Sequence, residues 1–598
     1  MKLHLLPIWL ILLAFMLAVP CLGAFSATNN VSLMASSPAS DSNGGLFNTG
    51  ATFAADGSAS LSGGTWYFSS SAYHFVSGDV GYFLFLKAGT NSNPAFYLIT
   101  GISGNSAALK TTAGTATLYP SYTLNTVGSL ATGAQTSLSS LTWGVDYSCS
   151  TSLAAGGPGA PRLALTGLSY LTNTTYIFYQ ATSSNENLQG NGVQVTGGTG
   201  WTPGVYQITS VQSTYLVVDR ACNTSSGTGG TANIGGAFLT PGAAITNMVG
   251  QNTLFVGAGT YSVATAPPAL PGGTIVSLTQ IVGYNTVRGD ITPTSGLTRP
   301  VIQASAGMPA ILGETNSAIG IFNLTVDGNA QTTTGCILGS QSSILVFNCR
   351  LIGFTSYGFV GSFPDVSIIN TEVSSPSNTV STAALLASSS SESFVSDYIH
   401  DVAAPGISFS ALGGGGTVKN CVIASCTGAS SDGIVSTASP LYVYSTDIYG
   451  CGRDAIHYTP NTSAPSEIIQ NNIFANNGGA GINMTNGLHP YSTNWDYNAF
   501  LSNTGGNVVN IGTASGFVMP LSQSLSGSPW VNVSTSGGLM NNSNFALNNT
   551  AGAGAACQNT GSPSAFVGTG VTNSYTYLGA IGPTPNAGGT IGRGRVMN

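Results

Sequence analysis

Two aspartates, Asp432 and Asp454, stand at matching positions in successive repeats of the chain. Each immediately precedes a short phrase, Gly433-Ile434 in one repeat and Ala455-Ile456 in the next. If the repeats stack as neighbouring strands, the two Cα atoms lie about 5 Å apart. At that separation one carboxyl raises the pKa of the other. Paired carboxylates of this kind carry out acid–base hydrolysis of glycosides.

Arg453 and His457 flank Asp454 and add a second kind of chemistry to this candidate site. Either side chain could be the base of a lyase or epimerase. The acids could then hold a cation such as Ca²⁺, which would neutralise a uronate. The alternative is a solvated turn with an Arg–Asp ion pair, which contributes little to stability. Another group has similar residue types: Asp397, His400 and Asp401.

Aromatic residues near these acids are candidates for carbohydrate binding. Tyr458, Tyr491 and Trp495 follow the candidate acids in sequence and could stack on sugar rings at the edge of a groove. Aromatic side chains that pack in turns or in the core are the alternative.

The cysteines suggest one disulfide and no metal site. Eight remain after the N-terminal segment, an even number that permits disulfides. Cys426 and Cys451 lie at the same offset from the central residues of successive repeats, Asn420 and Ser445. Stacking at about 4.8 Å would bring the two within bridging range, and a ladder of buried free thiols is the alternative. No cysteine or histidine cluster has zinc-ligand spacing, so no metal is predicted apart from the Ca²⁺ that a lyase could use.

A repeating phrase over residues 318–486 positions these candidates. A central Asn or Ser recurs at steps of 25, 22, 26, 24, 25 and 26 residues, with a large apolar residue three positions further on in every copy. A period of this length indicates stacked repeats. The central positions are Asn323, Asn348, Asn370, Ser396, Asn420, Ser445 and Asn471.

Stacking is required because one coil alone has nothing against which to bury its inward side chains. Asn suits a sharp turn, since it tolerates the left-handed conformation and its amide can bond to the Asn above and below. Nothing from 252 to 515 shows sustained helical spacing. We therefore predict an all-β protein, with a parallel β-helix solenoid at 241–520 and a C-terminal cap and flexible tail at 521–598.

The chain before the solenoid reads as small β-rich modules. Short apolar runs alternate with Gly, Asn and Pro. We predict a leader and first module at 25–140 and a second module at 141–240. A set of residues recurs at an offset of 109: Gly89-Thr90, Tyr97 and Ile99-Thr100, then Gly198-Thr199, Tyr206 and Ile208-Thr209.

Three phrases resemble coils of exported bacterial right-handed parallel β-helix proteins, which have the pectin-lyase-like fold: Asn323–Asn329, Ile468–Asn477 and Gly481–Met484. The resemblance implies a polysaccharide-binding or polysaccharide-active protein. Asp432 and Asp454 partly resemble the acidic turns of polygalacturonases. However, Arg453 stands where that family has a second Asp, and Gly479-Ala480-Gly481 replaces its Gly-His-Gly.

The net charge and the N-terminal sequence indicate which partners the protein can have and where it is located. Charged residues make up 5% of the chain and the net charge is −7, which argues against nucleic-acid binding. Met1-Lys2 followed by apolar Leu5–Val19 predicts a signal peptide at 1–24. No later run is long and apolar enough to span a membrane. We expect a secreted or cell-surface protein.

Ionisable side chains are sparse, which favours binding over catalysis, because lyases and hydrolases need clustered acids and bases. We rank three possible functions. The first is binding of a polysaccharide or cell-surface glycan, or adhesion, without catalysis. The second is a polysaccharide lyase, epimerase or glycoside hydrolase that acts on uronate-type polymers through the Asp432, Arg453, Asp454 and His457 face. The third is a phage-tailspike-like protein.

Overall fold

The computed structural model describes residues 29–558, apart from 36–37, 52, 111–115, 119–121, 125–128, 152–156, 170–174, 179–186, 275–276, 287, 292–295, 342, 363–364, 377–379, 381, 389–391, 411–415, 438–439, 460–466, 486–494, 511–518, 520, 534–539 and 541–542. The predicted signal peptide, Tyr491 and the tail from 559 lie outside the described residues. The chain divides into two compact units, one chiefly of residues up to 239 and the other chiefly of residues from 254 on.

The first module is a closed antiparallel barrel in the order β10-β3-β4-β7-β6-β5. Its strands are β3 (Ala54–Ser62), β4 (Thr65–Ser69), β5 (Phe83–Ala88), β6 (Ala95–Ser103), β7 (Ser106–Lys110) and β10 (Ser137–Asp146). β10 crosses the boundary predicted at 140, because Thr142–Asp146 pair with β5 and Trp143 is buried in the barrel core. Shorter elements of this part of the sequence are β1 (Asn29–Leu33), β2 (Leu46–Asn48), the 3-10 turn η1 (Ser77–Asp79), β8 (Ala116–Leu118) and β9 (Tyr122–Leu124).

The second module repeats the strand order of the first. Its sheet runs β11-β16-β13-β14-β15-β12, which corresponds to β3-β10-β5-β6-β7-β4 around the closed barrel. The strands are β11 (Leu163–Leu168), β12 (Tyr176–Phe178), β13 (Gly192–Trp201), β14 (Gly204–Val211), β15 (Tyr215–Val218) and β16 (Asn223–Ile234). β13, β14 and β15 each begin 109 residues after β5, β6 and β7. Equivalent hydroxyls make equivalent bonds: Tyr97 to the Asn93 carbonyl at 2.7 Å and Tyr206 to the Thr202 carbonyl at 2.8 Å. The predicted internal repeat is confirmed.

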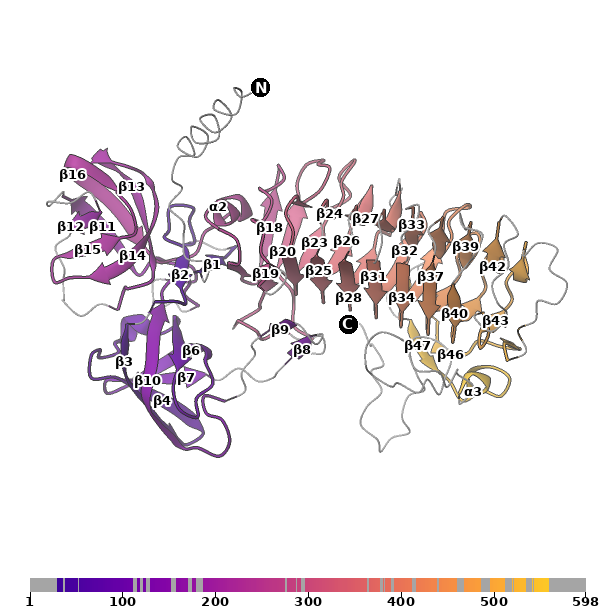
Figure 1. The fold of residues 1–598 in the computed structure, drawn as a ribbon, viewed down its shortest axis with the longest axis horizontal. Helices are drawn as coiled ribbons and strands as arrows, with labels where there is room; N and C mark the ends of the chain where they lie inside the picture. The colour runs from indigo at the N-terminus through magenta and orange to yellow at the C-terminus, as the bar shows by residue number, and fades with distance from the viewer. Residues whose placement is uncertain are drawn as a thin grey trace, which may run out of the picture. The chain divides into compact units, whose positions relative to one another are not determined.

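The second unit is a solenoid of three sheets, whose stacked arrows follow one another along the chain in Figure 1. Sheet 1 contains β17 (Thr253–Val256), β19 (Thr279–Gly283), β22 (Ile319–Phe322), β25 (Ile344–Phe347), β28 (Val366–Ile369), β31 (Glu392–Val395), β34 (Gly416–Lys419), β37 (Leu441–Tyr444) and β40 (Ile468–Gln470). Sheet 2 contains β18 (Thr260–Val263), β20 (Val301–Ala304), β23 (Thr325–Asp327), β26 (Arg350–Ile352), β29 (Glu372–Ser374), β32 (Tyr398–Val402), β35 (Val422–Cys426), β38 (Asp447–Tyr449), β41 (Ile473–Ala475), β43 (Ala499–Leu501) and β45 (Gln523–Ser524). Sheet 3 contains β21 (Leu312–Glu314), β24 (Ile337–Gly339), β27 (Tyr357–Gly361), β30 (Ala383–Ala387), β33 (Ile407–Phe409), β36 (Ile434–Ser436), β39 (Ile456–Tyr458), β42 (Ala480–Met484) and β44 (Gly506–Val509).

From β19, β18 and β21 onward, neighbouring strands of the three sheets pair in parallel. Each strand thus pairs with its copy one coil away, as stacking of the repeat requires. The predicted all-β class and parallel solenoid are confirmed, with β-rich modules before it in sequence. The helix α2 (Pro241–Thr246) precedes β17 in sequence. No helix among the described residues is both long and apolar enough to cross a bilayer.

The turn asparagines behave as the repeat predicts. All seven central Asn and Ser residues have φ between +46° and +62°, the left-handed region. Asn348 donates its amide to Asn323 Oδ1 at 2.7 Å, and Asn370 donates to Asn348 Oδ1 at 3.0 Å. The apolar residues three positions further on form one interior column of fully buried side chains: Val326, Leu351, Val373, Ile399, Ile423, Ile448 and Phe474.

The described residues between 528 and 558, part of the region that we predicted to cap the solenoid, include a segment that packs against the outer face of sheet 2. They contain the antiparallel pair β46 (Trp530–Asn532) and β47 (Asn544–Leu547) and the short helix α3 (Gly554–Cys557). Trp530 and Phe545 join an apolar cluster with outward side chains of sheet 2. Tyr398 donates its hydroxyl to the Met540 carbonyl at 2.6 Å, which ties this segment to β32.

Candidate functional site

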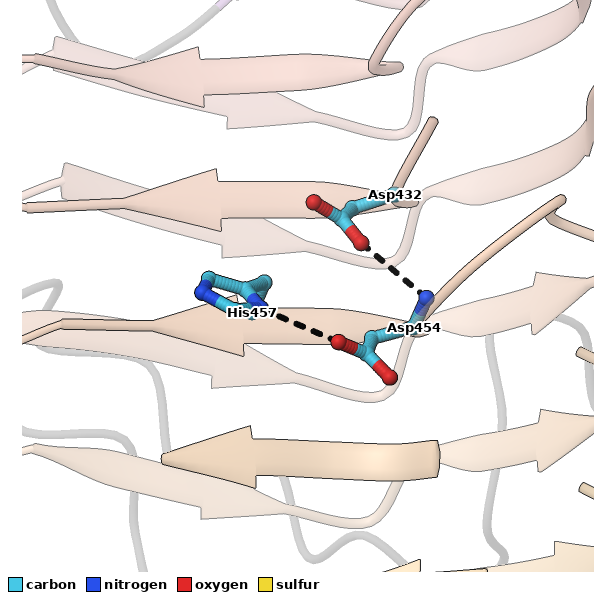
Figure 2. Close-up of side chains that lie close together, drawn as sticks. All are labelled: Asp432, Asp454 and His457. Atoms are coloured by element: carbon cyan, nitrogen blue, oxygen red, sulfur yellow. Dashed lines mark hydrogen bonds and ion pairs between the residues drawn. The ribbon is translucent and has the colours of Figure 1, made fainter. Parts of the chain in front are cut away.

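The solenoid brings the four predicted polar residues together on sheet 3. β36 and β39 pair in register, with Ile434 opposite Ile456, so that Asp432 and Asp454 stand on adjacent coils just before these strands. The backbone N–H of Asp454 donates to Asp432 Oδ1 at 3.0 Å. His457 is the middle residue of β39 and points to the Asp454 carboxylate (Figure 2).

Arg453 neutralises Asp432. Its Nε donates to Asp432 Oδ1 at 2.8 Å, and its Nη2 donates to Asp432 Oδ2. The hydrogen bonds to Asp432 raise the pKa of Arg453 above its ordinary value, although partial burial acts against them. The Asp432 carboxylate is fully buried, whereas 41% of the Arg453 side chain is exposed. The guanidinium therefore covers a buried anion and presents its remaining N–H groups to solvent.

Asp454 is held by three donors. The Ala480 N–H lies 2.7 Å from its Oδ1, and its Oδ2 accepts from Asn483 Nδ2 at 2.8 Å and from His457 Nδ1 at 3.0 Å. Burial pushes the pKa of Asp454 upward, but these hydrogen bonds outweigh burial and lower that pKa below its ordinary value. An ionised Asp454 fixes the His457 tautomer, because a carboxylate only accepts and Nδ1 must then carry the proton.

Thr485 completes a chain of hydrogen bonds that the sequence did not reveal. Its Oγ1 lies 3.2 Å from His457 Nε2. Thr485 follows β42, one coil beyond His457, and lies diagonally across the sheet from it. Both Thr485 and Asn483 are partly exposed.

The cluster does not suit the calcium ion that the sequence suggested for a lyase. Ligand atoms of Asp432, Asp454 and His457 lie within 4.8 Å of one another. Calcium prefers oxygen ligands, however, and one of these atoms is an imidazole nitrogen. Arg453 also holds both oxygens of Asp432. A cation would therefore have to displace that guanidinium from Asp432.

Two of the three predicted sugar-stacking aromatics lie among the described residues, and neither is at a groove edge. Tyr458 and Trp495 are fully buried, so neither presents a ring face to a ligand, and this prediction is wrong for both. Tyr458 donates its hydroxyl to Glu467 inside the solenoid. The alternation of β39 explains the burial of Tyr458, since His457 points outward and its neighbour must point inward.

Cys426 and Cys451 are buried free thiols rather than a disulfide. They stack on adjacent coils as their common offset predicts. Burial, reinforced by the neighbouring Cys426, raises the pKa of the Cys451 thiol well above its ordinary value. The pair is therefore a rung of the apolar interior, which is the alternative that the spacing left open.

The second predicted group belongs to a buried network on sheet 2. His400 Nδ1 lies 2.7 Å from Asp401 Oδ2, and His400 Nε2 lies 3.6 Å from Glu372 Oε1. Arg350 binds both oxygens of Glu372 at 2.9 Å. Asp397 is turned away and accepts the Thr371 N–H. His400 and Asp401 are buried, and Asp401 also accepts the Met540 N–H at 2.8 Å, so this group fastens the C-terminal segment.

A row of hydroxyl side chains follows sheet 3, and we call it the hydroxyl row. The residue directly after each of the first eight strands of this sheet is Ser or Thr, and all eight are exposed or partly exposed. From the second member on, each N–H donates to a carbonyl of the coil before, which fixes the row in register. The members are Thr315, Ser340, Ser362, Ser388, Ser410, Thr437, Thr459 and Thr485.

An apolar column runs beside the hydroxyl row on the same face. It contains the outward, partly exposed residues Leu338, Val360, Leu386 and Val435, with Ser408 between the last two. The column continues on the next two coils as His457 and Asn483. The hydroxyl row therefore ends at the polar cluster, where His457 and Asn483 interrupt the column before Val509 on the next coil. From Ser340 on, each member of the hydroxyl row lies two residues after a column residue in the sequence. A comparison of that position across the repeats would therefore have revealed the row from the sequence.

Comparisons with known proteins agree with the observed fold. Residues 364–518 match the family model described as a right handed beta helix region. The solenoid is accordingly a right-handed β-helix. No curated protein matches the chain.

Similar solved structures include a pectate lyase, Pel9A, at 14% identity and a TM-score of 0.40, over 59% of this chain and 92% of that one. The A-module of the Azotobacter vinelandii mannuronan C-5 epimerase AlgE4 shares 12% identity, with a TM-score of 0.25, over 44% and 91% of the two chains. Tailspike protein 2 of the Escherichia coli O157:H7 bacteriophage CAB120 shares 12% identity, with a TM-score of 0.31, over 60% and 49%. At these identities and TM-scores the similarity assigns no activity to this chain.

Proposed function

We propose that this right-handed β-helix protein is an exported protein that binds a polysaccharide chain along the outer face of sheet 3 without cleaving glycosidic bonds. The observation that carries the proposal is the hydroxyl row beside the apolar column. The row repeats one hydroxyl per coil, about 4.8 Å apart. A ligand that binds such a row must itself repeat polar groups along a line, as a sugar polymer does.

The chemistry of the face suits a sugar. A hydroxyl can donate one hydrogen bond and still accept others, so members of the row that bond to the coil before keep acceptor positions outward. Ser340 Oγ, for example, donates to the Glu314 carbonyl at 3.0 Å. The adjacent Leu and Val side chains provide an apolar strip for the C–H faces of sugar rings. Recognition sites commonly combine such apolar lining with a few placed polar groups.

The polar cluster gives the face a distinct end. Arg453 uses two N–H groups on Asp432 and has further donors on its exposed side. Guanidinium groups recognise carboxylates and other anionic oxygens. A chain that lies along the row would thus place an acidic or strongly polar sugar substituent at Arg453.

The same cluster argues against hydrolysis of the glycosidic bond by its carboxylates. A catalytic carboxylate must exchange a proton with substrate or water, or attack the sugar. Asp432 accepts two bonds from Arg453 and one from the Asp454 N–H, and Asp454 accepts three bonds of its own. With these donors in place, neither carboxylate is available for that work.

A glycan panel tests the proposal. We expect full-length protein to bind at least one polymer, and Ser410→Tyr, which fills the row, to weaken binding at least tenfold. Ser393→Tyr is the matched control, because Ser393 is a partly exposed residue of β31 on sheet 1. Equal binding by the two variants would contradict the proposal. So would the release of reducing or unsaturated sugar ends from any polymer of the panel.

A further inference from the structure

We infer that Thr485, His457 and Asp454 form a hydroxyl–imidazole–carboxylate relay that hydrolyses acyl esters carried by the bound glycan. The inference rests on the proposed function for the identity of its ligand. Its chemistry rests on the hydrogen-bond geometry alone. Nucleophile, base and orienting acid in mutual hydrogen-bond reach are the geometric signature of covalent acyl transfer.

The hydrogen bonds connect Asp454, His457 and Thr485 in that order across two adjacent coils. Asp454 accepts the Nδ1–H of His457 at 3.0 Å, which leaves Nε2 as the acceptor. Nε2 lies 3.2 Å from Thr485 Oγ1, so the hydroxyl can donate to it. The Ala480 N–H and the Asn483 amide, at 2.7 and 2.8 Å, hold the carboxylate in place. The imidazole is therefore oriented by a rigid part of the sheet.

Saturation of Asp454, which argues against glycosidic cleavage, suits this relay. In a triad the carboxylate does not take the proton; it stays ionised and holds the imidazole in one tautomer. A carboxylate with three donors performs that task. Thr485 and His457 are both partly exposed on the outer face, so an ester group of a ligand on that face can reach the hydroxyl.

The position of Thr485 defines the substrate class. Thr485 is the last member of the hydroxyl row, and His457 and Asn483 continue the apolar column beside it. A glycan on the row would pass directly over the Thr485 hydroxyl. The substrate is therefore an ester of a small acyl group, such as acetyl, on a polysaccharide.

The relay would act in two balanced steps. Thr485 Oγ attacks the ester carbonyl carbon while His457 Nε2 takes its proton, the bond to the sugar oxygen breaks, and His457 returns the proton to that oxygen. Water then attacks the acyl-threonine with His457 again as base, which releases the carboxylic acid and restores the hydroxyl. Asn510, on the next coil, binds Asn483 Oδ1 at 2.8 Å through an exposed amide, a donor of the kind that stabilises an oxyanion.

The experiment uses the full-length protein with two probes, p-nitrophenyl acetate and acetylated xylan. We expect hydrolysis of both, and Thr485→Ala and His457→Gln should lower the rate by about 100-fold or more, the usual worth of a positioned base. Thr485→Ser should retain activity because it keeps the nucleophilic oxygen. Thr417→Ala is the control, since Thr417 is a partly exposed threonine on β34 of sheet 1. Acid-quenched wild-type protein should carry one acetyl group on the peptide that contains Thr485.

Two results would overturn the inference: no hydrolysis above the Thr485→Ala background, or hydrolysis that survives that substitution. Melting temperatures of the variants show whether each is folded. Glycan binding measured on the same samples separates the two proposals. Intact binding without ester hydrolysis contradicts only this inference, whereas hydrolysis of p-nitrophenyl acetate without glycan binding contradicts the proposed function and the glycan substrate but leaves the relay itself in place.

Discussion

The guanidinium of Arg453 joins two coils by holding both oxygens of the fully buried Asp432 carboxylate. The same carboxylate accepts the N–H of Asp454 on the coil of Arg453. Asp432 is therefore neutralised by Arg453, and Asp454, although ionised, has both carboxylate oxygens bound by donors of the sheet. Acids that are bound in this way are compatible with ligand binding but are not available for hydrolysis of a glycosidic bond.

Removal of Arg453 should destabilise the solenoid. Arg453→Met leaves the Asp432 carboxylate buried with only a backbone donor, and we expect a cost of about 1–3 kcal/mol, below that of a fully buried pair because Arg453 is partly exposed. Urea unfolding of the Arg453→Met and Asp432→Asn variants and their double mutant measures the coupling. A coupling free energy of zero would show that the pair is not an interacting unit.

In the asparagine ladder, the left-handed backbone and the side-chain amide should contribute separately to stability. Asn348 has φ of +52° and bonds through its side chain to Asn323, Asn370 and Arg299. Asn348→Ala should cost about 2–4 kcal/mol, from lost hydrogen bonds and from the left-handed backbone. Asn348→Gly should recover about 1 kcal/mol of this, because glycine tolerates the conformation. Equal unfolding free energies for the two variants would refute the backbone part.

Glu314 should make stability depend on pH. Burial raises its pKa from 4.5 to about 8, and the Leu270 N–H only partly offsets this. Between those two values the folded chain keeps a proton that the unfolded chain releases, so stability falls as pH rises, by up to about 1.4 kcal/mol per pH unit. Glu314→Gln should remove this slope and raise the melting temperature at pH 8. Parallel pH profiles of melting temperature for variant and wild type would contradict the assignment.

The C-terminal segment should open when its apolar anchor is removed. Trp530 packs against Tyr449 and Phe545, and the buried Cys557 belongs to the same cluster. Trp530→Ala should expose Cys557 to a maleimide reagent under native conditions, since Trp to Ala changes in cores cost about 3–5 kcal/mol. The exposed Val531 provides the control variant Val531→Ala. Labelling of Cys557 at the wild-type rate in both variants would show that Trp530 does not hold the segment.

The fold was predictable because the repeat encodes its own register. The Asn or Ser at each sharp turn and the apolar residue three positions later are local signals, so they give both the coil length and the inward column. The offset of 109 between Tyr97 and Tyr206 likewise predicts two modules with matching strands. The end of the first module was harder, because β10 pairs with residues of β5 that lie 54 to 63 positions earlier in the chain.

Alignment of equivalent positions in successive repeats predicted only part of the candidate site. Asp432, Arg453 and Asp454 meet because they occupy neighbouring turn positions on adjacent coils, and His457 lies on the strand that follows Asp454. Thr485 reaches His457 diagonally, one coil further, and no sequence spacing marks that contact. Whether an acid is available to a substrate depends on its hydrogen-bond donors. Those donors include backbone N–H groups such as that of Ala480, which the residue types do not reveal.

The most direct test of glycan binding along sheet 3 is the dissociation constant of oligosaccharides of increasing length from the polymer that binds. Because the hydroxyl row extends over eight coils, we predict that affinity for wild-type protein rises with each added sugar until several coils are covered. Ser410→Tyr should abolish that gain, and Ser393→Tyr should preserve it. A monosaccharide that binds as tightly as the long oligosaccharides, or a length dependence that survives Ser410→Tyr, would contradict the account.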